Sequence, residues 1–273
     1  MRKIFDSHAH VFPDKIAQKA ADNIGSFYSI PMGLDGSVST LLGLQKHYGI
    51  TGFLIQSVAT VPQQVESINN FIAETVKQHP DSFIGFGALH PDMEDPEKEI
   101  ERIITLGLRG VKLHPDFQNF KADSPEAMRL YALLEGKLPL LIHAGDRRYD
   151  LSHPKRIAHI LEQFPKLDVI AAHFGGWSQW DEAQEYLVGK RVWVDTSSSL
   201  YDLSPERAKE LIKAFGEDYV LFGTDYPMWE IGEELNRFDQ LKLPEQTQEK
   251  ILYQNLMGLL KRYPNVHAIS CKE

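Results

Sequence analysis

The sequence is poor in cysteine and contains no long apolar run. Cys271 is the single cysteine among 273 residues, so a framework of disulfide bonds is excluded and a reducing environment is the expectation. No apolar stretch approaches the roughly 20 residues that a membrane-spanning helix needs. The first residues, Met-Arg-Lys, are not followed by the apolar run of a signal peptide. We therefore expect a cytoplasmic protein.

Positive charge is scarce relative to negative charge. The chain has 29 lysines and arginines against 38 aspartates and glutamates, which gives a net charge of −9 with histidine neutral. An acidic surface repels phosphate groups, so neither nucleic acid nor an anionic membrane is expected as a partner. The same argument disfavours a metal-dependent nuclease or phosphoesterase. A small-molecule substrate is the partner that this composition allows.

Apolar runs rich in β-branched residues alternate with helical patterns along the whole chain. The expected strands lie at 3–10, 51–56, 83–89, 109–114, 138–143, 167–173, 191–195 and 219–224. The expected helices lie at 15–24, 39–48, 65–78, 96–106, 125–134, 153–164, 180–187, 205–215 and 244–260. This alternation predicts an α/β protein with a single (β/α)8 barrel domain over 1–273, and an elaborated first loop at 11–48. A doubly wound open sheet is the alternative, but no G-x-G-x-x-G follows the first strand.

The first expected strand contains two histidines of the same parity. A strand therefore places His8 and His10 on one face. Same-face neighbours lie roughly 6–7 Å apart at Cα. Two imidazoles at that separation can converge on one cation, at about 2.0–2.1 Å from each nitrogen. Taken alone, the pair fits a surface position equally well, so the other strands decide.

Further polar residues fall at the carboxyl ends of later strands, where barrels of this class carry their chemistry. They are Lys112 and His114 on the fourth strand, His143 on the fifth, His173 on the sixth and Asp225 after the eighth. Each one alone could be a satisfied core or turn residue. A buried charge or imidazole is costly unless it is paired or binds a metal. The set as a whole therefore predicts a metal centre.

Five motifs resemble, in the same order, those of the amidohydrolase superfamily, and within it the amidohydrolase 2 branch that includes aminocarboxymuconate-semialdehyde decarboxylase. They are Asp6-Ser7-His8-Ala9-His10, Gly110-Val111-Lys112-Leu113-His114-Pro115, Ile142-His143-Ala144-Gly145, Ala172-His173-Phe174-Gly175-Gly176 and Phe222-Gly223-Thr224-Asp225-Tyr226-Pro227. The metal ligands that the resemblance implies are His8, His10, His143 and Asp225. It further implies that Asp225 also moves a proton and that His173 is a catalytic residue beside the metal. The implied cofactor is one divalent metal, usually zinc, with manganese, iron or cobalt as alternatives.

Lys112 leaves a second metal open. Some members of the superfamily carry a carbamylated lysine at the end of the fourth strand, where it bridges two metals. A lysine beside a divalent cation loses its proton more readily, and the neutral amine can take up CO2. A cationic Lys112 that faces the substrate or pairs with a carboxylate is the simpler interpretation, so we favour one metal. His114 shares the strand parity of Lys112 and is expected to contact the metal or the substrate in the same pocket.

The expected site suits two reactions. A bound divalent ion lowers the pKa of water from about 15.7 to about 7. Asp225 could accept that proton while His173 polarises a carbonyl, which favours a hydrolase of a small ester, lactone or amide. The alternative is a non-oxidative decarboxylase of a small unsaturated or aromatic acid, since the same residues could protonate carbon as CO2 leaves. A non-catalytic metal-binding protein is disfavoured because both His173 and Asp225 are present.

Loop residues beside these strand ends are candidate substrate contacts. Arg147 and Arg148 follow the fifth strand and could hold a carboxylate through paired hydrogen bonds, although solvated loop charges are an equal interpretation. Trp177 and Tyr226 suit a planar substrate, or alternatively cap the barrel or form a subunit contact. A homodimer is compatible with the family, but the sequence contains no feature diagnostic of one.

Overall fold

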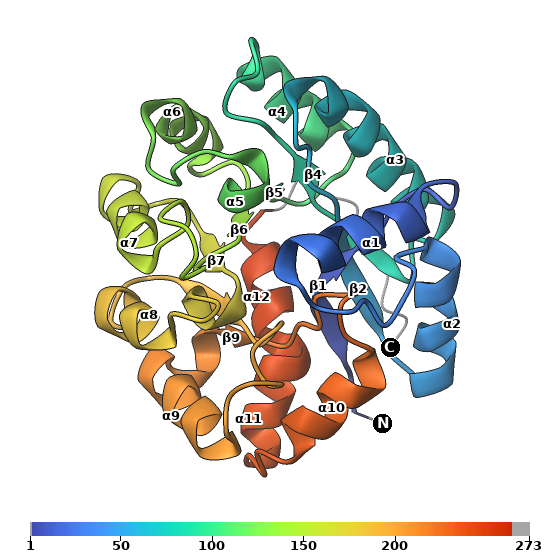
Figure 1. The fold of residues 1–273 in the computed structure, drawn as a ribbon, viewed down its shortest axis with the longest axis vertical. Coiled ribbons are helices and arrows are strands. Elements are labelled where there is room, and N and C mark those ends of the chain that lie inside the picture. Colours follow the sequence, from blue (N-terminus) through green and yellow to red (C-terminus); the bar gives the residue numbers. More distant parts are fainter. Residues whose placement is uncertain (1, 264–273) are drawn as a thin grey trace.

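Short parallel strands form the centre of the molecule, and helices surround them (Figure 1). The computed structural model describes residues 2–263, so Cys271 lies outside the described residues. The strands are β1 (Phe5–His10), β2 (Gly52–Gln56), β3 (Phe83–Gly85), β4 (Gly87–Ala88), β5 (Val111–Leu113), β6 (Leu140–Ile142), β7 (Val169–Ala171), β8 (Trp193–Asp195) and β9 (Val220–Leu221). Every predicted strand is present, and most are shorter than predicted.

The strands pair in sequence order and close into a barrel. β1 to β3 form one parallel sheet and β4 to β9 another. Only Phe86 separates β3 from β4, and its backbone N–H donates to Ile55 O on β2, so the two segments act as one strand. At the other seam, Ser7 N lies 2.8 Å from Phe222 O and His10 N lies 2.7 Å from Tyr226 O. The predicted (β/α)8 barrel is confirmed.

The helices follow the predicted pattern, apart from an interruption in the last helix and two helices that were not predicted. They are α1 (Ala17–Tyr28), α2 (Val38–Tyr48), α3 (Val65–Gln78), α4 (Pro96–Thr105), α5 (Pro115–Gln118), α6 (Pro125–Leu134), α7 (Pro154–Gln163), α8 (Trp180–Leu187), α9 (Pro205–Phe215), α10 (Ile231–Asp239), α11 (Glu245–Glu249) and α12 (Asn255–Lys261). The predicted last helix is interrupted by a π-helical turn at Lys250–Gln254. Helices α5 and α10 were not predicted from the sequence. No helix in the described part of the chain is long and apolar enough to cross a membrane.

Apolar side chains from the strands and from α12 form a cluster separate from the main hydrophobic core. Its members include Phe5, Leu54, Ile84, Phe86, Leu141, Ile170, Trp193 and Leu221 from the strand region, with Leu256, Leu259 and Leu260 from α12. Removing this apolar area from water stabilises the fold by about 25 cal/mol per Å². The end of α12 lies at the amino ends of the strands, where Arg109, just before β5, donates to Leu260 O. The polar side chains at the carboxyl ends of the strands therefore face the open end of the barrel.

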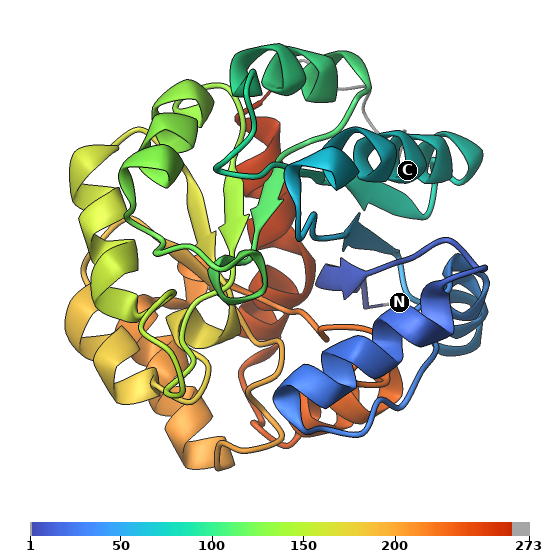
Figure 2. The same ribbon diagram turned by 45° about the horizontal axis from the view of Figure 1, so that its top comes forward.

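The long connection between β1 and β2 contributes to that open end. It contains α1 and α2, and α1, the long blue helix, lies beside the carboxyl ends of the strands (Figure 2). Tyr28, the last residue of α1, contacts His114 and Trp177 there. Ser37 caps α2 by accepting a hydrogen bond from Thr40 N. The isolated bridge between Phe12 and Ser37 joins the start of this connection to the residue just before α2. The predicted elaborated loop at 11–48 is therefore part of the wall above the barrel.

Candidate metal centre

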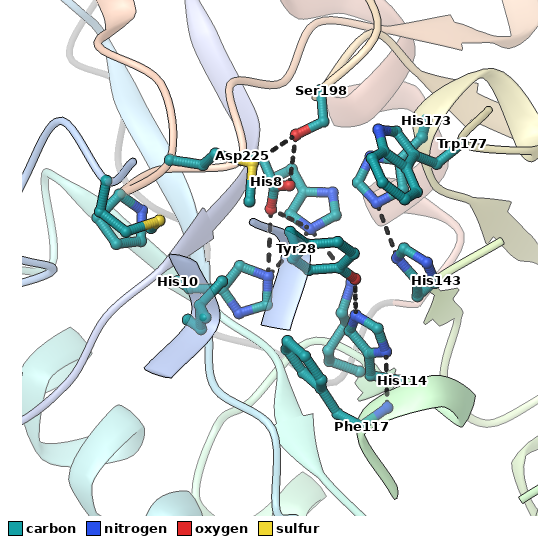
Figure 3. A pocket seen from close by; sticks show the side chains of 15 residues that line it. His8, His10, Tyr28, His114, Phe117, His143, His173, Trp177, Ser198 and Asp225 are labelled. Atoms are coloured by element: carbon teal, nitrogen blue, oxygen red, sulfur yellow. Dashed lines mark hydrogen bonds and ion pairs between the residues drawn. The ribbon is translucent and has the colours of Figure 1, made fainter. Parts of the chain in front are cut away.

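The open end of the barrel brings His8, His10 and Asp225 together (Figure 3). The Nε2 atoms of His8 and His10 lie 3.2 Å apart. Oδ1 of Asp225 lies 3.3 Å from Nε2 of His8 and 3.4 Å from Nε2 of His10. Their donor atoms all lie within 4.8 Å of one another, so this group could hold a metal ion.

His8 presents a lone pair to this group. Its Nδ1 lies 2.9 Å from Oδ2 of Asp195, a carboxylate that only accepts, so Nδ1 carries the ring proton. Burial and the nearby Lys112 lower the pKa of His8 to about 4, so the ring is neutral near pH 7 and Nε2 is unprotonated. A carboxylate behind a histidine ligand fixes the tautomer in this way at many metal sites.

His10 and Asp225, the other two residues of this group, are also in protonation states that suit binding of a cation. Burial lowers the pKa of His10 below its usual range, which keeps this imidazole neutral. Burial alone would raise the pKa of Asp225, but His8 and His10 outweigh it and hold that pKa well below its usual value. Two neutral imidazoles and one carboxylate are donors that zinc and related divalent ions accept. The residues present therefore fit a divalent metal.

Lys112 reaches the same nitrogen of His8. Its Nζ lies 3.1 Å from Nε2 of His8, and the side chain is fully buried. Burial lowers the pKa of Lys112 to about 8, although Asp225 and Asp195 act in the opposite direction. The ammonium group satisfies the His8 lone pair, so a metal ion at His8 would compete with this hydrogen bond. A carbamylated Lys112 that bridges two metals stays a prediction.

His143, the fourth ligand implied by the resemblance, faces His173 instead of the group above. Nδ1 of His143 lies 2.9 Å from Nε2 of His173. The far nitrogens of the two rings lie 2.7 Å from Gly145 O and 2.9 Å from Ser197 O. Because a carbonyl only accepts, each neutral ring carries its proton on the far nitrogen, and two lone pairs face each other. A shared proton or a cation is needed to satisfy them.

A second group of possible ligands comprises His114, Asp116 and His143, whose donor atoms also lie within 4.8 Å of one another. The rings of His114 and His143 stack with centroids 3.9 Å apart. Burial raises the pKa of Asp116 to about 7, so this carboxyl is partly protonated near neutral pH. Nε2 of His143 already donates to Gly145 O, so the group offers fewer lone pairs than His8, His10 and Asp225.

Tyr28 enters the site from α1, a contact that the sequence analysis missed. Nδ1 of His114 accepts a hydrogen bond from Phe117 N at 3.3 Å, so the proton of the neutral ring is on Nε2. That nitrogen lies 2.9 Å from the Tyr28 hydroxyl and therefore donates to it. The phenol can then donate its own proton to a ligand. Burial raises the pKa of Tyr28 well above its usual range, so the phenol stays protonated.

Two hydroxyl groups hold the acidic residues of the site in place, and neither was singled out from the sequence. Ser198 donates to Oδ2 of Asp225 at 2.6 Å, while Trp229 Nε1 donates to Ser198 at 2.9 Å. Thr224 donates through its hydroxyl to Asp6 at 2.6 Å and through its backbone N–H at 3.0 Å. This contact ties β1 to the segment that carries Asp225. Serine and threonine carry little sequence signal, so only their positions after strand ends could have indicated them.

The cavity at this centre is small, with a volume of about 20 Å³. Trp177, one of the predicted substrate contacts, lines it together with Tyr28, Phe117 and Met228. These side chains give the cavity an aromatic and apolar wall above the polar floor. A planar group would fit between them if the wall opened.

The other three predicted substrate contacts do not line this cavity. Arg148 pairs with Asp146 at 2.7 Å and lies over several aromatic rings, 5.3 Å from that of Tyr28. Arg147 is exposed and donates to Ser178 O. The Tyr226 hydroxyl donates to Ser37 O at 2.8 Å. Their polar groups are engaged within the loops, so a grip of the arginines on a substrate carboxylate stays a prediction.

Comparison with known proteins places these motifs in a family. The family model described as Amidohydrolase matches residues 5–262. The chain belongs to the amidohydrolase family. The resemblance inferred from the sequence is confirmed. The chain is an enzyme of the amidohydrolase superfamily.

Two curated amidohydrolase relatives are decarboxylases by name. Gamma-resorcylate decarboxylase of Polaromonas sp. is 26% identical over 249 residues, which cover 71% of this chain and 74% of that protein. The 2-amino-3-carboxymuconate-6-semialdehyde decarboxylase of Dictyostelium discoideum is 26% identical over 245 residues, which cover 72% of this chain and 66% of that protein.

The solved structures share the barrel. One is a dihydroxybenzoic acid decarboxylase from Polaromonas sp., determined with bound manganese and the inhibitor 2-nitroresorcinol. It has a TM-score of 0.73 and 18% identity, and the match covers 96% of this chain and 97% of that chain. At this identity the likeness supports the fold.

Proposed function

We propose that this amidohydrolase is a metal-dependent, non-oxidative decarboxylase of a small unsaturated or aromatic carboxylic acid. The observation that carries the proposal is the Asp225 carboxylate, which is 14% exposed, beside the unprotonated Nε2 of His8 and under an aromatic wall. From the sequence alone, hydrolysis was the first prediction and decarboxylation the alternative. The names of the relatives favour the second reaction, so we reverse that order.

His8, His10 and Asp225 would hold one divalent ion, with zinc or manganese as the candidates. His143 would join them only if its ring turned away from Gly145 O. When bound, the ion supplies positive charge that anchors the carboxylate and a neighbouring oxygen of the substrate. Trp177 and Phe117 line the cavity beside these residues, and a planar ring would lie against them once the wall opened.

Asp225 is the residue that we assign to proton transfer. Its low pKa leaves it ionised near pH 7, so it can accept a proton from a hydroxyl group next to the substrate carboxylate. It then returns that proton to the carbon that bears the carboxylate. The bond from that carbon to CO2 breaks, CO2 leaves, and the ring keeps its electrons as a phenolate. Solvent finally protonates the phenolate, which balances the reaction.

Two neighbours support that transfer. Ser198 donates to Oδ2 of Asp225 and so leaves Oδ1 to face the histidines. His173 stacks on His8 with ring centroids 5.2 Å apart, within reach of a substrate group bound beside Asp225. We assign His173 to polarising the substrate carboxylate or its neighbouring oxygen, through a proton on Nε2 that it shares with His143.

The test is a panel of ortho-hydroxylated benzoic acids and one lactone, incubated with the metal-loaded protein. We expect CO2 and the corresponding phenol in equal amounts from at least one acid, and no opening of the lactone. Asp225→Asn should abolish turnover with an unchanged circular dichroism spectrum, whereas Asp14→Asn, at an exposed position, should leave it intact. Lactone opening without CO2 release would show that the protein is a hydrolase instead.

A further inference from the structure

A second cavity adjoins the metal centre between α1 and α3. Its volume is about 510 Å³, against about 20 Å³ at the centre itself. His10, Ile24 and Phe117 line both cavities, so they form the wall between them. Small-molecule sites usually measure about 300–1,000 Å³. The larger cavity therefore has the size of a ligand site, whereas the centre admits little more than a water molecule.

The chemistry of the larger cavity is apolar. Its walls include Phe12, Ile16, Ala20, Phe27, Ile68 and Phe71. Besides the His10 imidazole, the polar side chains on its walls are amides and hydroxyls. None of its lining side chains among the described residues is an aspartate, glutamate, lysine or arginine. A charged ligand would lose its hydration here without gaining a partner, whereas an apolar one gains about 25 cal/mol per Å² buried.

The position of this cavity links it to the reaction. His10 has one side on the larger cavity, and its Nε2 lies 3.4 Å from Oδ1 of Asp225. A substrate whose carboxylate reaches Asp225 cannot be held by the 20 Å³ cavity alone, so most of its volume must lie elsewhere. The shared wall at Ile24 and Phe117 is the direction in which space is available.

We propose that the cavity between α1 and α3 holds an uncharged apolar extension of the substrate, so the natural substrate is a carboxylic acid with an alkyl or aryl substituent of several carbons. The proposal rests on the proposed function in that the acid end is anchored at the metal centre. It adds that the size of the apolar substituent, and not the acid group, sets the specificity of this protein.

Binding of two phenols to the metal-loaded protein tests this proposal. Resorcinol carries the dihydroxylated ring alone, and 4-hexylresorcinol adds an apolar chain. Calorimetry should show that the hexyl compound binds the wild type at least about tenfold more tightly, because each buried CH2 favours binding. Ala20→Trp fills the cavity from α1 and should reduce this preference to within about twofold. Lys19→Trp adds the same ring at the neighbouring exposed position and should keep it.

Unchanged resorcinol affinity in both variants would show that the metal centre is intact. Equal affinities for the two phenols in the wild type, including no binding of either, would overturn the proposal. So would a preference that survives in Ala20→Trp, or one that Lys19→Trp removes equally. A preference that behaves as expected in a protein that releases no CO2 from any acid would reject the decarboxylase and leave the cavity assignment standing.

Discussion

The Nδ1 atom of His8 lies 2.9 Å from Oδ2 of Asp195, and both side chains are fully buried. His8 lies at the centre of the proposed metal site, so Asp195 decides which nitrogen of His8 is available to a cation. Oδ1 of Asp195 accepts hydrogen bonds from the backbone N–H groups of His173 and Ser197 at 3.0 and 3.1 Å. These contacts determine which oxygen faces His8.

Asp195→Asn should therefore weaken metal binding without unfolding the protein. The backbone donors keep the amide oxygen in the Oδ1 position, so the NH2 group faces His8 and donates to Nδ1. His8 must then carry its proton on Nε2, where it cannot bind a metal. Loss of such a partner typically costs 10–100-fold in metal affinity. Competition with a chelator of known affinity would measure it, and an affinity equal to that of the wild type would contradict the assigned tautomer.

Tyr28→Phe should reduce activity toward hydroxylated acids. The phenol is positioned to donate its proton to the substrate because His114 already donates to the phenol oxygen at 2.9 Å. A net hydrogen bond is worth about 0.5–1.5 kcal/mol, so kcat/KM should fall by roughly 2- to 12-fold. Tyr149→Phe is the matched control, since that side chain is 43% exposed and outside the cavity. An unchanged kcat/KM in Tyr28→Phe would show that Tyr28 is part of the wall only.

Gly145→Ala should destabilise the fold more than Gly107→Ala does. Both glycines have a positive φ, of 83° and 80°, so alanine at either position costs roughly 1–2 kcal/mol. At Gly107 an added Cβ meets nothing within 4 Å, but at Gly145 it would lie 2.4 Å from the backbone of Gly176 and Trp177. Overpacking of this kind destabilises the folded state by about a further 1–3 kcal/mol. Urea unfolding of both variants measures the difference, and equal losses would show that the loop moves freely.

The sequence predicted the barrel because its strands and helices have strong, regular patterns. The parity of His8 and His10 predicted that both face one side, and their Nε2 atoms lie 3.2 Å apart. Missing α10 was avoidable, since Ile231, Leu235 and Phe238 repeat at helical spacing and are all buried.

The parts that the sequence did not predict depend on contacts between distant segments. Tyr28 reaches the site only because α1 lies beside the carboxyl ends of the strands, which no local pattern specifies. Arg148 was predicted as a substrate contact, which stays a prediction, while its ion pair with Asp146, two residues earlier, was not foreseen. Asp195 ends the seventh predicted strand, so its position at a strand end was the available signal.

The most direct measurement of the central claim is the metal content of protein purified without added metal, determined by elemental mass spectrometry. His8→Ala removes one proposed ligand, and His47→Ala removes an exposed histidine of α2 as a control. We expect about one divalent metal per chain in the wild type and in His47→Ala, and a large loss in His8→Ala. Two metals per chain would instead favour a carbamylated Lys112. Equal metal content in His8→Ala and the wild type, or a wild type without metal, would contradict the assignment of His8, His10 and Asp225 as the metal centre.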